Sequence, residues 1–145
     1  MSAIITGVDG SEPAATAAAT AAKLAFALGT RLVVVCAYER LEHHEVDTGD
    51  QHIEFTSEDQ AQEVANRTVA PLMETYPGLK VKVEARQGKP ADALLASAEA
   101  NEAGIIVVGN KRVQGVVSRL LGSVATELLR KATCDVYIAY THPRS

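Results

Sequence analysis

The segment 107–129 contains both glycines and basic side chains, and its sequence is VVGNKRVQGVVSRLLGSVATELL. Its three glycines are Gly109, Gly115 and Gly122. Glycine after a strand lets main-chain N–H groups converge, and the N-terminus of a following helix adds about half a positive charge. Gly122 and Ser123 directly precede a helix-like run, while Lys111 and Arg112 supply formal positive charge. The pattern therefore predicts a site for a phosphate group.

Asp9 closes another apolar run, Ala3 to Asp9, and is the candidate for the opposite side of such a site. Its carboxylate can accept hydrogen bonds from an adenine amine or a ribose hydroxyl, or lie near a phosphate-bound magnesium ion. A purely structural interpretation stays open beside this one. In that case the glycines only form turns, Ser123 only caps a helix, and Asp9 only belongs to an Asp-Gly turn.

The elements that must position these residues alternate along the chain. Apolar runs predict strands over 3–9, 31–38, 104–110 and 134–140, and alternating apolar and charged residues predict a half-exposed edge strand over 79–85. Helical spacing predicts helices over 13–28, 57–76, 90–100 and 124–131. Strict alternation predicts an α/β fold: a single doubly wound domain over 1–145, with a five-stranded, mainly parallel sheet and four helices. Ligands bind such sheets at the carboxyl ends of the strands, where connections diverge. If the first and fourth strands flank that point, Asp9 faces Gly109.

Residues 39–56, ERLEHHEVDTGDQHIEFT, lack a sustained period and are predicted to form a long surface loop. The loop contains His43, His44 and His52, which we expect to be solvated, with chance metal binding as the alternative. Ser57 and Gln60 have the spacing of a capping box at the start of the next helix.

Composition and charge exclude several classes of protein. A length of 145 residues fits one domain, and a net charge of −4 gives no attraction for nucleic acid. No apolar run reaches the ~18 residues of a membrane span, and the N-terminus lacks a signal-peptide pattern, so we expect a cytoplasmic protein. Cys36 and Cys134 lie in apolar runs and are expected to be buried, reduced thiols.

Motifs of common catalytic classes are missing from the sequence. No GxGxxG follows the first strand, and QGKPAD has proline where a P-loop needs serine or threonine. There is no GxSxG and no HExxH, and His43, His44 and His52 lie in the acidic loop and not near a candidate nucleophile. We therefore predict no catalytic residue and no protein-based metal site.

Four stretches of the chain resemble the universal stress protein family. They are IITGVDGSEPA, LVVVCAY, GKPADALLASAEANEAGIIVVGN and GNKRVQGVVSRLLGSVATELLRKATCDVYIAY. ATP-binding members carry glycine, two residues, glycine, nine residues, then glycine with serine or threonine. Gly109, Gly122 and Ser123 match this pattern, whereas Arg112 occupies the second glycine position.

The resemblance implies an adenine-nucleotide alpha hydrolase-like fold and a cytoplasmic homodimer that binds ATP with Mg²⁺ and acts in stress response or regulation. It places Asp9 and the backbone of Ala37 at the base, Gly7 and Val8 against the nucleoside, and Gly109, Ser123 and Val124 at ribose and phosphates. The complete set of implied nucleotide-binding residues is Gly7, Val8, Asp9, Ala37, Gly109, Asn110, Arg112, Gly115, Gly122, Ser123 and Val124. The last strand, Val136 to Tyr140, would pair across the dimer.

Arg112 keeps two alternatives open. Its charge suits phosphate, and Gly115 lies three residues further on, which favours retained nucleotide binding. Alternatively, the side chain closes the pocket, and the protein is an interaction or chaperone-like module. Cyclic AMP is a third expectation, because some family members bind it. Any ATP hydrolysis is expected to be weak.

Overall fold

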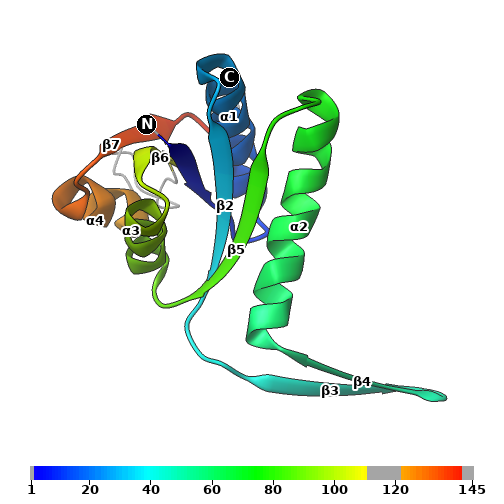
Figure 1. Ribbon diagram of the computed structural model, residues 1–145. Helices are drawn as coiled ribbons and strands as arrows, with labels where there is room; N and C mark the ends of the chain where they lie inside the picture. The colour runs from blue at the N-terminus through cyan, green and yellow to red at the C-terminus, as the bar shows by residue number, and fades with distance from the viewer. Residues whose placement is uncertain (1, 111–121, 142–145) are drawn as a thin grey trace.

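A computed structural model describes residues 2–110 and 122–141 (Figure 1). The main sheet contains β1 (Ala3–Gly7), β2 (Arg31–Tyr38), β5 (Val81–Gln87), β6 (Ala103–Gly109) and β7 (Asp135–Ala139). The helices are α1 (Glu12–Leu28), α2 (Ser57–Thr75), α3 (Pro90–Ala100) and α4 (Ser123–Lys131). The strand order is β5-β2-β1-β6-β7, and every neighbouring pair is parallel. The predicted α/β fold with a doubly wound, five-stranded sheet and four helices is confirmed.

Two apolar cores lie on opposite faces of the sheet. Val34 of β2 packs in the core under α1 and α2, whereas its neighbour Val33 packs in the core under α3 and α4. Both side chains are fully buried. Figure 1 shows the two helical layers on either side of the strands. From Leu32 to Ala37, β2 is therefore apolar at every position, as a strand covered on both faces requires.

Helix α1 lies close to the sheet because its buried stripe is made of alanine. Ala18, Ala21 and Ala25 on this stripe have no exposed surface. The Ser11 hydroxyl caps the helix by accepting a hydrogen bond from the N–H of Ala14, at 3.3 Å. Gly29 ends it in the left-handed conformation, with φ of 66°. The helix begins one residue before the predicted start at 13 and ends at the predicted residue 28.

The segment 39–56 is not the long loop that its composition predicts. It forms an antiparallel hairpin of β3 (His43–Thr48) and β4 (Gln51–Thr56). The hairpin projects from the body of the domain (Figure 1). The turn uses Gly49 in the left-handed conformation. Each strand carries only one or two apolar residues, so the alternation that marks a strand was too weak to recognise.

Strand ends also differ from the prediction. β1 ends at Gly7, two residues before Asp9, because Asp9 and Gly10 turn the chain toward α1. β5 begins at Val81 and extends to Gln87, since its pairing with β2 continues to Tyr38. Among the described residues, no helix has the length and apolar character needed to cross a bilayer.

The capping box of α2 lies one residue earlier than predicted. The Thr56 hydroxyl accepts from the N–H of Asp59 at 3.1 Å, and the Asp59 carboxylate accepts from the N–H of Thr56 at 2.9 Å. Ser57, predicted as the cap, instead donates to the carbonyl of Arg40 and accepts from the N–H of Glu42. Both Thr56 and Ser57 have the sequence of a cap. Thr56 forms it because the Ser57 hydroxyl is hydrogen-bonded to Arg40 and Glu42, in the segment that leads into the hairpin.

Replacing Thr56 with alanine is expected to lower the free energy of unfolding by about 1 kcal/mol, because the first turn of α2 loses its cap. Gln60→Ala is the matched control, since Gln60 is an exposed first-turn residue outside the capping box. We expect that control to change stability by less than ~0.5 kcal/mol. Urea denaturation measures both values, and equal losses would contradict the assignment of the cap.

Candidate functional site

The carboxyl ends of β1 and β6 lie side by side at the centre of the sheet. β1 pairs with β2 on one side and with β6 on the other. β1 leads through α1 to β2 on one side, whereas β6 is followed by α4 and β7 on the other side, and α1 and α4 cover opposite faces of the sheet. This is a topological switch point, where open α/β sheets bind ligands. The structure therefore brings Gly7 and Gly109 to the edge at which the sequence predicted a crevice.

A cavity of about 220 Å³ opens at this edge. Eight of the predicted site residues line it: Gly7, Val8, Asp9, Ala37, Gly109, Gly122, Ser123 and Val124. Asn110 follows Gly109 and is described below. Arg112 and Gly115 lie outside the residues that the structure describes. The other lining residues are Ser11, Pro13, Ala14, Val35, Pro90, Leu94, Val108 and Ala125, most of which are apolar.

Close packing explains the two glycines at the strand ends. A Cβ atom on Gly109 would lie 2.9 Å from the Cγ2 of Thr141. On Gly7 it would lie 3.1 Å from both methyl carbons of Leu94. A side chain at Gly109 would force Thr141 to shift, and one at Gly7 would require Leu94 to move by a few tenths of an ångström, independently of any ligand.

Asn110 ties the end of β6 to the end of β7. Its N–H donates to the carbonyl of Ala139 at 3.0 Å, and its side-chain oxygen accepts from the N–H and the hydroxyl of Thr141 at 2.8 and 3.0 Å. These bonds hold Gly109 at the rim of the cavity. Asn110 thus has a structural contribution that its prediction as a nucleotide-binding residue did not include.

Asp9 forms the Asp-Gly turn that the structural interpretation of the sequence predicts. One carboxylate oxygen accepts from the N–H of Ser11 at 2.9 Å, which forms the Asp-Gly turn with Gly10 at a φ of 85°. The residue is nonetheless exposed and lines the cavity. A carboxylate has several acceptor positions, so this turn leaves Asp9 able to accept from a ligand.

The N-terminus of α4 forms the other side of the cavity. Its N-cap is Gly122, and no side chain among the described residues caps the first turn, in contrast to Ser11 in α1. Ser123, Val124 and Ala125 of this turn all line the cavity. Because uncapped N–H groups and the helix dipole both favour negative charge, this turn can bind an anion.

A family model supplies the decisive comparison. The model of the universal stress protein family matches residues 1–139. The chain belongs to this family. A curated relative, the universal stress protein Rv1636 of Mycobacterium tuberculosis, is 32% identical over 148 residues, which cover 95% of each chain.

Solved structures of universal stress proteins share the fold. One in complex with cAMP matches with a TM-score of 0.74 at 23% identity, covering 97% of this chain and 98% of that chain. The protein from Archaeoglobus fulgidus in complex with dAMP matches with a TM-score of 0.69 at 22% identity, covering 95% and 97%. At these identities, the likeness establishes the universal stress protein fold of this chain.

Several residues of this universal stress protein site escaped the sequence analysis. Pro90 and Leu94 of α3 line the cavity beneath Gly7, and Thr141 supports Gly109. Pro90 was recognised only as the start of a helix. The predicted topology could have indicated Pro90, because the N-termini of helices that follow parallel strands lie at the same edge of the sheet.

The two cysteines differ in burial. Cys36 is buried as predicted, and burial raises the pKa of its thiol, to which the charge of Asp9 adds. Cys134 is only partly buried, which corrects the prediction, because it precedes the edge strand β7. Burial and the neighbouring Asp135 raise the pKa of Cys134 as well. Both raised values disfavour the reactive thiolate.

Proposed function

We propose that the chain binds ATP in the crevice between β1 and β6 and acts in stress response or regulation, as a homodimer in the cytoplasm. The observation that carries this proposal is the cavity itself. One side is the uncapped first turn of α4 with Gly109 and Gly122, and the other is an apolar wall that ends at Asp9. These are the two surfaces that an adenine nucleotide needs, one for phosphate and one for the base.

The base would lie against the apolar wall. Val8, Val35 and Ala37 contribute to it from the ends of β1 and β2. Asp9 at the rim supplies an acceptor for the adenine amine or a ribose hydroxyl. An apolar pocket with few, well-placed polar groups is the usual form of a small-molecule site.

The phosphates would extend toward α4. A volume of about 220 Å³ is below the roughly 300–1,000 Å³ of a complete ligand pocket. A triphosphate must therefore reach the rim at Ser123 and Val124, where N–H groups are available. Arg112 belongs to the proposed site as a phosphate ligand. Mg²⁺ would be held mainly by phosphate oxygens and water, with Asp9 nearby.

Any hydrolysis of ATP should be slow. Asp9 is the one ionisable side chain among the described residues that line the cavity, and its carboxylate already accepts from Ser11. These described residues therefore position no base to activate water on the phosphate side. A turnover near that of an ordinary enzyme, about 10 per second, would contradict this account.

The identity of the adenine nucleotide is part of the proposal. The two solved neighbours are complexes with cAMP and dAMP, which supports adenine recognition by this chain. We favour ATP because Gly109, Gly122 and Ser123 have the spacing of ATP-binding members. Competition between ATP and cyclic AMP distinguishes the two, and displacement of ATP by equimolar cyclic AMP would favour the cyclic nucleotide.

The homodimer would form through β7. This strand is an edge of the sheet, and Tyr137 and Tyr140 are 45% and 46% exposed. An exposed edge with aromatic side chains favours pairing with a second strand. Light scattering should give the mass of two chains, whereas a monomer at micromolar concentration would contradict this part of the proposal.

Calorimetric titration of nucleotide-stripped protein with Mg-ATP tests the proposal. We expect saturable binding at or below millimolar concentration. In Arg112→Gly the affinity should fall by about 10- to 100-fold, since a hydrogen bond to a charged group contributes ~1.5–3 kcal/mol. If the native protein gives no heat of binding, nucleotide binding is contradicted. If Arg112→Gly then gains binding, Arg112 blocks the pocket and the alternative function as an interaction module is favoured.

A further inference from the structure

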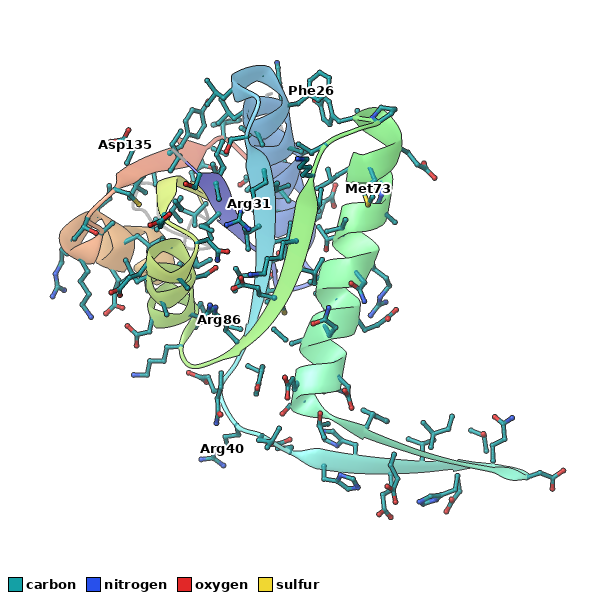
Figure 2. The ribbon with its side chains drawn as sticks, in the orientation of Figure 1. Phe26, Arg31, Arg40, Met73, Arg86 and Asp135 are labelled. Carbon is teal, nitrogen blue, oxygen red and sulfur yellow. The ribbon has the colours of Figure 1, made fainter. Side chains whose placement is uncertain are left out.

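The β3–β4 hairpin has one face made only of polar and charged side chains. The register pairs His43 with Thr56, Glu45 with Glu54, and Asp47 with His52. Alternate residues of a strand share a face, so these six side chains lie together. The hairpin's side chains project to both sides of its ribbon (Figure 2). This face, which we call the histidine–carboxylate face, lies outside the nucleotide cavity.

Donor atoms on this face lie at metal-ligand spacing. The Nε2 of His43 is 3.7 Å from a carboxylate oxygen of Glu45 and 3.9 Å from one of Glu54. All three ligand atoms lie within 4.8 Å of one another. Ligands of a tetrahedral Zn²⁺ ion, at about 2.0–2.2 Å from the metal, are ~3.4 Å apart. The three side chains need only small rotations to close around an ion.

A second imidazole, that of His52, contacts the same Glu54 carboxylate. The Nδ1 of His52 lies 2.6 Å from Asp47, and its Nε2 lies 3.1 Å from the Glu54 carboxylate. Glu54 is therefore shared by His43 and His52. Protein metal sites commonly use a carboxylate to fix the tautomer and direction of a ligand histidine. Asp47 is placed to do this for His52.

The hairpin has more carboxylates than cationic side chains, and its histidines contact them. Residues 41–56 contain five carboxylates and no lysine or arginine. Three of the five, Glu45, Asp47 and Glu54, lie on the histidine–carboxylate face. A bound divalent cation would offset their repulsion. Two imidazoles among carboxylates favour a borderline transition metal such as Zn²⁺ over Mg²⁺ or Ca²⁺, which prefer oxygen ligands alone.

We propose that the histidine–carboxylate face binds one divalent transition-metal ion through His43, Glu45 and Glu54, with His52 as the fourth ligand and Asp47 as its positioning residue. The ion joins β3 to β4 across the hairpin. Since an isolated two-stranded hairpin is marginally stable in water, the ion stabilises the pairing of β3 with β4.

Titration of tag-free, nucleotide-free protein with Zn²⁺ tests this proposal by calorimetry. The matched variants are His43→Gln and His44→Gln, which each remove one imidazole from adjacent positions of the same strand. His44 lies on the opposite face, where its ring stacks on Phe55 with centroids 5.2 Å apart. Glu54→Gln removes the shared carboxylate and keeps its size.

We expect one Zn²⁺ per chain, with affinity reduced at least about tenfold in His43→Gln and Glu54→Gln and unchanged in His44→Gln. Weak binding without saturation, or equal losses in His43→Gln and His44→Gln, would overturn the proposal. Circular dichroism verifies that each variant keeps the fold. Because no nucleotide is present, this outcome is independent of whether the crevice binds ATP.

Discussion

Ser123→Asp is expected to lower the affinity for ATP by at least about tenfold without lowering the melting temperature. Ser123 is the first residue of α4, is exposed, and lines the cavity. A carboxylate there would occupy the N–H groups that the phosphates need, and it would repel them; two like charges 4 Å apart cost about 4 kcal/mol near a protein surface. The same carboxylate stabilises the helix dipole by about 0.3–1 kcal/mol.

Ser123→Asp is expected to lower the affinity for ATP but not the melting temperature, and this combination makes the prediction specific. A general loss of structure would lower both affinity and stability. Thr126→Asp is the matched control, because Thr126 is exposed on the same helix but does not line the cavity. We expect it to reduce affinity much less. Calorimetry and thermal unfolding provide the two readings, and a Ser123→Asp protein with native affinity would exclude α4 as the phosphate site.

Glu84→Ala is expected to lower the free energy of unfolding by about 2 kcal/mol at neutral pH. The Glu84 side chain is 10% exposed, and its carboxylate accepts from Arg86 at 2.6 Å, from Ser97 at 2.9 Å and from Asn101 at 2.9 Å. Ser97 and Asn101 are buried, so the variant leaves buried donors without this acceptor. Lys82 also contacts the carboxylate, at 3.2 Å.

The Glu84 carboxylate also makes the free energy of unfolding depend on pH. Burial alone would raise the pKa of Glu84, but hydrogen bonds from Arg86, Asn101, Ser97 and Lys82 lower it to about 2, from an ordinary value of 4.5. Since the folded pKa is the lower one, the contribution of Glu84 is fully present above about pH 4.5. It is lost as the pH falls from there toward 2.

Glu84→Gln isolates this effect because glutamine does not titrate. The stability difference between the native protein and Glu84→Gln should be constant from pH 7 to 5 and should shrink at pH 3. Urea denaturation at each pH measures it. Glu99→Gln, which changes an exposed carboxylate at the end of α3, is the control and should change stability by less than ~0.5 kcal/mol. A difference that does not change with pH would contradict the lowered pKa of Glu84.

The sheet was predictable because its signal is strong. The buried parallel strand β2 is a valine-rich apolar run, and the helix α1 has a capping serine, a stripe of alanines and a glycine at its end. The hairpin was not predictable by the same means. Its strands are mostly exposed, so their pairing depends on the turn at Gly49 and on cross-strand contacts such as Asp47 with His52.

Some residues of the candidate site could be predicted from the local sequence, whereas others depend on the order of the strands in the sheet. The Gly109 and Gly122 pattern and the position of Asp9 predicted residues on both sides of one cavity. Leu94 beneath Gly7 and Thr141 beside Gly109 come from distant segments, and only the strand order brings them together. The hydrogen bonds of Asn110 to Thr141 depend on the β6–β7 pairing in the same way.

The amide NMR spectrum of the protein, recorded during titration with Mg-ATP, tests the central claim most directly. It reports whether the nucleotide binds and where. If ATP occupies the crevice, the N–H signals of Val8, Ser123 and Val124 shift together and saturate at the concentration found by calorimetry. An unchanged spectrum, or saturable shifts confined to residues outside the β1/β6 crevice, would contradict the account.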